Sequence, residues 1–306
     1  EIQTYKYKKA LEKCYKFYAK AKILQEIYNS STDLYAESLF YISIVHLFNN
    51  DLEISEKSLK KVKRLCEIFI EKNKDIKYFM NLKLNTLIYL FSVFIKTQNL
   101  KSSKKISELI EEENLDSLNL EQNLRLSLNE SQLLLLENKK EIALNCINEQ
   151  VCPESIYNNN EISLILKLDY FKHLSQLFNI LGNQTKSLEI IQLGIQLLES
   201  AGNHNSEDFY FLHVFFITSK IKILNEVFSS YEYDSQSVLN EILENYNIIK
   251  RILIENLSNE INDSNHKSFF GYLRKQIVFM SKNKMLKESL SVLEELLELE
   301  VKYYGK

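Results

Sequence analysis

The chain has 306 residues, a formal net charge of −3 and a pI near 6.1, so it lacks the broad positive potential that binding to duplex nucleic acid requires. Its 5 glycines and 1 proline are too few for a many-turned β protein or a glycine-loop enzyme, and their scarcity favours long helices. Hydrophobic residues make up 45% of the chain and charged residues 26%, a balance that excludes a disordered polymer and can bury a continuous core.

Apolar residues recur at intervals of three and four along nearly the whole chain, which is the pattern of helices with one buried face. Alternation with a period of two is essentially absent, so the sequence predicts an all-α protein. The predicted helices, in chain order, span residues 3–30, 33–49, 52–73, 75–97, 99–113, 117–137, 139–149, 158–181, 184–202, 206–229, 234–259, 264–283 and 285–303.

The segment 171–200, FKHLSQLFNILGNQTKSLEIIQLGIQLLES, has the most regular pattern. Two small residues, Ser175 and Ser187, lie twelve positions apart and allow two helices to approach closely. Gly182 lies between them, where the first helix ends in a conformation that a side chain would resist. The segment therefore predicts an antiparallel helical hairpin. Apolar residues flank the small residues at helical spacing, namely Phe171, Leu174 and Phe178 before the turn and Leu188, Ile191, Ile195 and Leu198 after it.

The same twelve-residue interval recurs from Ser43 to Ser55 and from Ser131 to Ala143, so we expect three hairpins in the same frame. Small residues of successive second helices lie 40 to 52 positions apart. Such self-similarity is the mark of a stacked repeat architecture, because each hairpin needs a neighbour to cover its apolar face. Weaker copies centre on Ser103, on Ser219 with Ser237, and on Ser289.

The order of large, apolar, small and aromatic residues in segment 171–200, F-x2-L-S-x2-F followed by S-x3-I, resembles the tetratricopeptide repeat (TPR). The chain departs from that family in its longer repeat interval and in placing Glu199 where a proline often ends the unit. The resemblance implies a right-handed α-solenoid, a TPR-like superhelix of about six stacked antiparallel hairpins, running through residues 1–306 as one continuous array. Another kind of helical-hairpin array is the alternative.

Two segments fall outside the frame. Residues 150–161, QVCPESIYNNNE, contain the single proline, Pro153, and an asparagine run, so we expect an irregular loop at 150–160, a long turn rather than a hinge. Residues 3–30 resemble the second helix of a repeat whose first half is missing. Because the chain opens at Glu1 without a methionine, we expect it to be a fragment of a longer protein.

No constellation that carries chemistry is visible. The motifs of hydrolase nucleophiles, phosphate loops and dinucleotide folds are all missing, so the sequence predicts a protein without enzymatic activity or cofactor. No two histidines lie four residues apart on a helix, so we expect no metal site. His46 occupies a position where an aromatic residue normally packs, and is predicted to be a hydrogen-bonded core histidine.

The four cysteines, Cys14, Cys66, Cys146 and Cys152, are scattered and form no C-x-x-C pair. This pattern favours reduced thiols and hence a cytoplasmic or nuclear location. No uninterrupted apolar run approaches the roughly 20 residues that cross a bilayer, so we expect no membrane contact.

These features predict a non-catalytic scaffold that binds a peptide or a segment of a partner protein in the concave groove of the array, without direct contact to nucleic acid. One alternative is a peptide-responsive regulatory receptor, similar to bacterial pheromone sensors. Another is the helical scaffold arm of a cell-division factor such as separase or a cohesin loader. The first helices of successive hairpins would line the groove, and the candidate contact residues on them are Asn85, Arg125, Gln132, Asp169, Lys172, Gln176, Asn179, His213 and Lys220.

Overall fold

The structure is a computed structural model that describes residues 2–28, 32–48, 50–72, 75–113, 115, 118–148 and 152–200, with isolated residues between 212 and 248. All of these belong to the first of two compact units, Ile2–Ile249; the second unit contains residues 250–306 together with Glu1. The helices predicted at 264–283 and 285–303 lie outside the described residues, and those predicted at 206–229 and 234–259 are described only at isolated positions, all helical.

The described residues form helices joined by turns, with no strand among them, as the periodicity predicts. Each predicted helix before residue 150 agrees with a helix of the structure to within three residues at either end. The helices are α1 (Ile2–Tyr28), α2 (Thr32–Phe48), α3 (Leu52–Glu71), α4 (Ile76–Lys96), α5 (Leu100–Glu111), α6 (Leu120–Leu136), α7 (Lys140–Asn148), α8 (Pro153–Asn158), α9 (Leu164–Ile180) and α10 (Gln184–Ser200).

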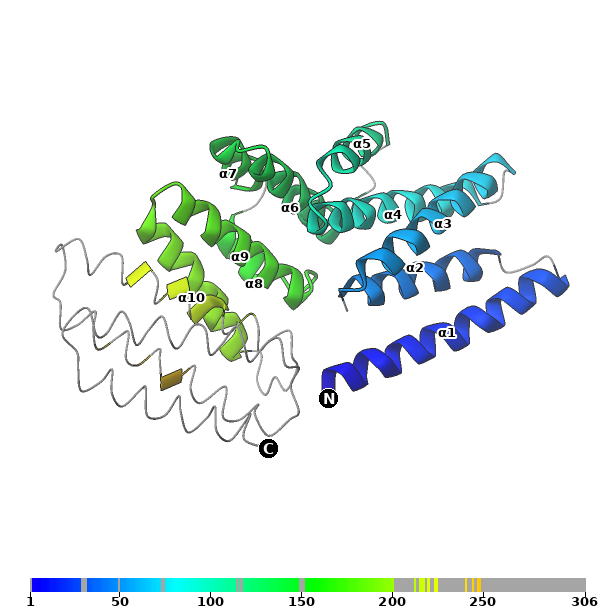
Figure 1. Cartoon of the computed structure of the whole chain (residues 1–306), viewed down its shortest axis with the longest axis horizontal. Helices are drawn as coiled ribbons and strands as arrows, with labels where there is room; N and C mark the ends of the chain where they lie inside the picture. The colour runs from blue at the N-terminus through cyan, green and yellow to red at the C-terminus, as the bar shows by residue number, and fades with distance from the viewer. Residues whose placement is uncertain are drawn as a thin grey trace. The chain divides into compact units, whose positions relative to one another are not determined.

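Eight of these helices pair as the hairpins α2–α3, α4–α5, α6–α7 and α9–α10 (Figure 1). We call α2, α4, α6 and α9 the first helices, and their partners the second helices. The main contacts of each hairpin are internal or with the next hairpin along the chain: α4 packs on both α2 and α3, α6 on both α4 and α5, and α9 on both α6 and α7. Helix α1 packs against α2. Contacts are therefore made mostly between neighbours in the sequence.

All four hairpins close with the same three-residue turn. Its middle residue has a positive φ in each case: 62° at Asn50, 54° at Gln98, 62° at Asn138 and 79° at Gly182. The backbone N–H of this residue donates to the carbonyl three positions earlier, and the next N–H donates to the carbonyl five positions before it. This pair of bonds is the Schellman motif, which satisfies carbonyls at the end of a helix. The predicted left-handed Gly182 is confirmed, and three other residues adopt the same conformation.

The twelve-residue pairs of small residues lie where the helices of a hairpin come closest, and all six residues are buried. In each pair a serine hydroxyl also donates to the partner's backbone carbonyl: Ser55 to Ser43 at 2.8 Å, Ser131 to Ala143 at 2.7 Å, and Ser187 to Ser175 at 2.8 Å. The close approach is thus confirmed, and it carries a hydrogen bond that the sequence pattern did not predict. The α4–α5 hairpin differs, because Phe91 occupies the first small position and Ser103 donates within its own turn, to Asn99 O.

One continuous hydrophobic cluster runs from α2 to α6, with Leu59, Val62, Leu87 and Phe91 fully buried in it. His46 is buried as predicted, and both of its ring nitrogens have hydrogen-bond partners, Tyr15 Oη and Asp51 Oδ2. In α3 and α5 the buried residues recur every three or four positions, and the lysines and glutamates of these helices lie outside the buried set, so amphipathic patterning accounts for the packing of these two helices.

Residues 152–163 differ from the predicted loop. Pro153 starts the short helix α8, and α9 begins at Leu164 rather than at 158. Proline is favoured in the first turn of a helix, where its missing N–H has no intrahelical partner to lose. Lys167 Nζ donates to Tyr157 O at 2.9 Å and holds α8 against α9.

Candidate functional site

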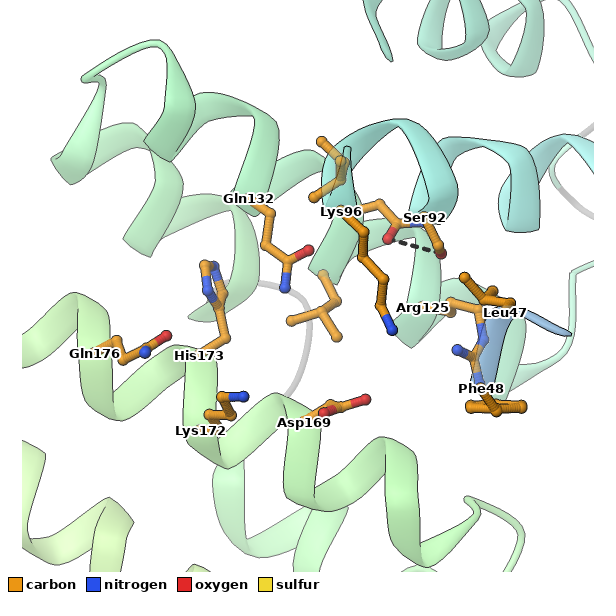
Figure 2. Close-up of a pocket in the computed structure, with 13 residues that line it drawn as sticks. Leu47, Phe48, Ser92, Lys96, Arg125, Gln132, Asp169, Lys172, His173 and Gln176 are labelled. Atoms are coloured by element: carbon orange, nitrogen blue, oxygen red, sulfur yellow. Dashed lines mark hydrogen bonds between the residues drawn. The ribbon is translucent and has the colours of Figure 1, made fainter. Parts of the chain in front are cut away.

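A cavity of about 430 Å³ lies on the face formed by the first helices (Figure 2). Helices α4, α6 and α9 each contribute one stripe of side chains, and the end of α2 closes one side with Leu47 and Phe48. The remaining lining residues are Ser92, Ile95 and Lys96 from α4, Arg125, Leu128, Asn129 and Gln132 from α6, and Asp169, Lys172, His173 and Gln176 from α9.

Several lining residues occupy equivalent positions on the first helices of successive hairpins. Counted from the small residue of each first helix, Arg125 and Asp169 lie six positions before it, and Gln132 and Gln176 lie one position after it. Residues six, three and two positions before and one after the small residue fall on one face of a helix, because these intervals approximate whole turns. Helix geometry therefore places these side chains of α6 and α9 on the face that lines the cavity.

The lining is predominantly cationic. It contains Lys96, Arg125 and Lys172 against the single carboxylate of Asp169. In Figure 2 the Lys96 side chain extends into the space in front of α9, where Asp169 and Lys172 lie. The Lys172 ammonium also lies 5.0 Å from the centroid of the Phe215 ring. An excess of positive charge in a partly enclosed space favours an anionic ligand.

Arg125 is held in place by its own neighbourhood. Its side chain is 12% exposed, its guanidinium carbon lies 4.8 Å from the centroid of the Tyr89 ring, and Nη2 is 3.6 Å from Glu121 Oε1. The last distance is longer than a hydrogen bond, and within the described chain no other oxygen accepts one from this guanidinium. A planar donor group that is stacked, nearly buried and short of acceptors is suited to a carboxylate ligand.

His173 is a buried, neutral histidine in the cavity wall. Burial, and secondarily the positive charge of Lys172, lower its pKa to about 4. Its Nε2 lies 2.9 Å from Ser131 Oγ, whose single proton is already donated to Ala143 O. Nε2 must therefore carry the ring proton, which leaves Nδ1 as an acceptor to which none of the described residues donates.

Asn129 is also buried in the wall. Its amide nitrogen donates to Ile88 O at 3.1 Å, and its amide oxygen accepts from the Ser92 hydroxyl at 3.0 Å, a bond drawn dashed in Figure 2. These bonds join α6 to α4 across the boundary between two hairpins. The packing of α6 against α4 thus fixes the positions of two polar side chains in the cavity wall.

A second cavity of about 240 Å³ is lined by α2, α4 and α6. Its α4 residues, Asn85, Ile88 and Tyr89, lie nearer the start of that helix than those of the first cavity. Arg125 lines both cavities. The second one is mainly aromatic and aliphatic on one side and polar on the other, where Gln122 Nε2 donates to Asn85 Oδ1. Its apolar wall consists of Phe40, Tyr41, Ile44, Ile88 and Tyr89.

The structure brings together most of the residues predicted from the sequence. The first cavity contains five of them and the second contains Asn85 with Arg125. Asn179 is half-buried near the end of α9 and lines neither cavity. Lys220 donates to Gln192 of α10 at 3.3 Å, so it contacts a second helix. His213 lies outside the described residues. The five predicted residues of the first cavity are Arg125, Gln132, Asp169, Lys172 and Gln176.

Sequence reasoning missed Lys96, Ser92, Asn129 and His173 as members of the wall. Asn129 and His173 lie two positions before the small residue, where both are buried at 3% exposure. A polar residue at the same place in two hairpins, next to the predicted polar positions, was the available signal.

No cluster of three or more histidine, cysteine or carboxylate side chains suited to a metal ion occurs among the described residues. In the same part of the chain one helix, α4, has the length and apolarity to cross a bilayer. However, 61% of its most apolar window is buried against other helices, and the core helix of a soluble protein meets the same criterion.

No protein-family model matches the chain, and no curated protein matches it.

Proposed function

We propose that the chain is a TPR-like array, a right-handed α-solenoid of stacked hairpins, and that it acts as a non-catalytic scaffold. Its ligand is a peptide or an extended segment of a partner protein, held in the groove that the first helices line. One observation carries this proposal: two adjoining cavities are lined by equivalent positions of successive first helices. In an array of repeats such positions form a continuous binding wall, and their side-chain amides and charges can bond to an extended backbone.

Two further observations support an intracellular scaffold. None of the four cysteines forms a disulfide, and Cys66 is buried, where desolvation raises its pKa to about 12 and keeps it unreactive. We therefore propose a cytoplasmic or nuclear location.

Site-specific photo-cross-linking tests the proposal. A photoreactive phenylalanine derivative is placed at Gln132 or at Gln176 in the first cavity, and the matched control carries it at Ile142, which is 56% exposed on α7. We expect both cavity positions to cross-link to the same segment of one partner, identified by mass spectrometry, and the control position to give no such product. Lys172→Ala in the cavity is expected to lower recovery of that partner.

Equal cross-linking at Ile142 and at the two cavity positions would contradict the proposal, as would unchanged recovery after Lys172→Ala. A second variant, Lys172→Met, keeps the aliphatic stem next to Phe215 and separates the loss of charge from the loss of folding.

A further inference from the structure

The two cavities differ in chemistry although they share a wall. The first is lined by three cations and one carboxylate, and its histidine is neutral. The second has an aromatic and aliphatic wall in which Phe40 is buried and packs edge-to-face on Tyr89 at 5.5 Å between ring centroids. A ligand that fills both must therefore carry an anionic group and an apolar group.

Arg125 lines both cavities, and its surroundings suit an anionic group of the ligand. The Tyr89 ring lies against the guanidinium, and Glu121 forms an ion pair with it at 3.6 Å, a distance too long for a hydrogen bond. Removing a guanidinium from water without giving it acceptors is costly, and a carboxylate that bonds to it in bidentate fashion offsets that cost. Lys96 and Lys172 in the same cavity add charge of the same sign.

The offset between the two cavities along α4 sets the scale of the ligand, and it is measured between their separate walls and not from Arg125, which they share. On α4 the lining moves from Ile88 in the second cavity to Ile95 in the first, which is seven residues. At 1.5 Å per residue this shift is about 10 Å. In a polyproline II segment, residues three apart lie on the same face and are separated by about 9 Å.

We infer that the groove recognises an extended acidic segment in which an Asp or Glu, bound by Arg125 between Lys96 and Lys172, lies three residues from an aromatic or large aliphatic side chain seated against Phe40 and Tyr89. This inference rests on the proposed function of the groove and assigns the chemistry of its ligand.

The test uses the full chain and a synthetic probe. The fluorescein-labelled peptide Glu-Pro-Pro-Phe-Pro-Pro-Glu, with both ends blocked, presents the required pair in either chain direction and favours the polyproline II conformation. Its binding is measured by fluorescence anisotropy. We expect the peptide with Gln in place of Glu, and the peptide with Ala in place of Phe, each to bind about tenfold more weakly, since each loses one of the two subsites.

Protein variants locate the binding. Arg125→Gln is expected to weaken the Glu peptide about tenfold without changing the Gln peptide, whereas Arg125→Lys retains the charge and should lose less. The matched control is Lys140→Gln, an exposed lysine on α7, which should have no effect. Thermal unfolding monitored by circular dichroism shows whether each variant is folded; if Arg125→Gln is not, Arg125→Lys and the peptide comparison on the unmodified protein decide the question.

Equal binding of the Glu and Gln peptides, or equal loss on Lys140→Gln and Arg125→Gln, would overturn the acidic chemistry. If cross-linking at Gln132 and Gln176 still captured one partner segment, the groove itself would stand and only its ligand class would be wrong.

Discussion

Ser131 joins three helices through one hydroxyl group. It donates to Ala143 O across the α6–α7 hairpin and accepts from His173 Nε2 on α9, and it is fully buried. Ser187 is equally buried but makes a single bond, to Ser175 O. Each serine links the two helices of its own hairpin, but only Ser131 also bonds to a helix of the next hairpin.

Ser131→Ala should therefore destabilise the protein more than Ser187→Ala. Loss of Ser131 leaves the buried N–H of His173 without an acceptor and is expected to cost about 2 to 3 kcal/mol, against about 1 kcal/mol for Ser187→Ala. Urea unfolding followed by circular dichroism measures both. Ser155→Ala, at an exposed position on α8, is the control and should stay within about 0.5 kcal/mol of the parent. Equal costs for Ser131 and Ser187 would contradict the three-helix role.

His173 gives the stability a pH dependence of known sign. Its pKa is about 4 in the folded protein and has an ordinary value of 6.5, so between these values the unfolded chain binds the extra proton. The contribution of His173 to the free energy of unfolding should be fully present above pH 6.5 and should fall by about 3 kcal/mol as the pH drops to 4. Below pH 4 this histidine should cause no further loss. Urea midpoints measured from pH 7 to pH 4 test this. His173→Gln should flatten the curve, and an unchanged slope in that variant would assign the effect to other groups.

At the scale of the helical elements, the recurrent turn explains both what the sequence predicts and what it misses. Glycine and asparagine tolerate a positive φ, so the turns at Asn50, Asn138 and Gly182 follow from residue type. Gln98 adopts the same conformation without such a preference, because the hairpin geometry around it requires that conformation. A Cβ added at Gly182 would meet no neighbouring atom within 4 Å, so the glycine is needed for its backbone conformation and not for space.

Gln98→Gly should therefore stabilise the chain by about 0.5 to 1 kcal/mol, since removing the left-handed strain outweighs the flexibility that glycine adds to the unfolded chain. Asn50→Gly is the matched control at the corresponding turn, where asparagine already relieves most of that strain and the gain should be smaller. Thermal unfolding midpoints compare the two variants. A larger gain at Asn50 than at Gln98 would contradict this account of the turns.

The short helix α8 could not be predicted from the periodicity of apolar residues. Its six residues are too few to establish a helical pattern, and Pro153 was interpreted as a breaker although it stands at the position where helices accept proline. The sequence also did not predict that Gly194 is a site of close packing. An added Cβ there would lie 2.6 Å from the Phe216 ring, and only the assembled structure brings these two residues together.

At the scale of the molecule, the described hairpins depend mainly on their immediate neighbours, which distinguishes them from a globular core in which distant segments interleave. The lining of the first cavity follows from this arrangement, so residues at one position of successive hairpins, such as Arg125 and Asp169, could be placed together from the sequence. Lys96 could not, because it lies at the end of α4 and reaches the first cavity only through the stacking of α4 against α6 and of α6 against α9.

Nearest-neighbour stacking predicts local rather than global loss of structure. Leu59→Ala in α3 removes a fully buried side chain and should cost about 3 kcal/mol. We expect faster amide hydrogen exchange in α2, α3 and the adjacent α4, with α9 and α10 unaffected, because those helices share no main contact with α3. Leu174→Ala in α9 is the reciprocal variant and should leave α2 and α3 protected. Uniform acceleration along the chain in either variant would favour one cooperative core.

The fixed twelve-residue interval inside three of the hairpins also determines where the chain can change in length. One residue inserted between Ser175 and Ser187 would rotate the following helix by about 100° about its own axis and carry its serine away from the carbonyl that it binds. The same insertion in the connection between α7 and α9 would leave both hairpins intact. We therefore expect a change in chain length to be tolerated in the connections between these hairpins and to be destabilising inside them.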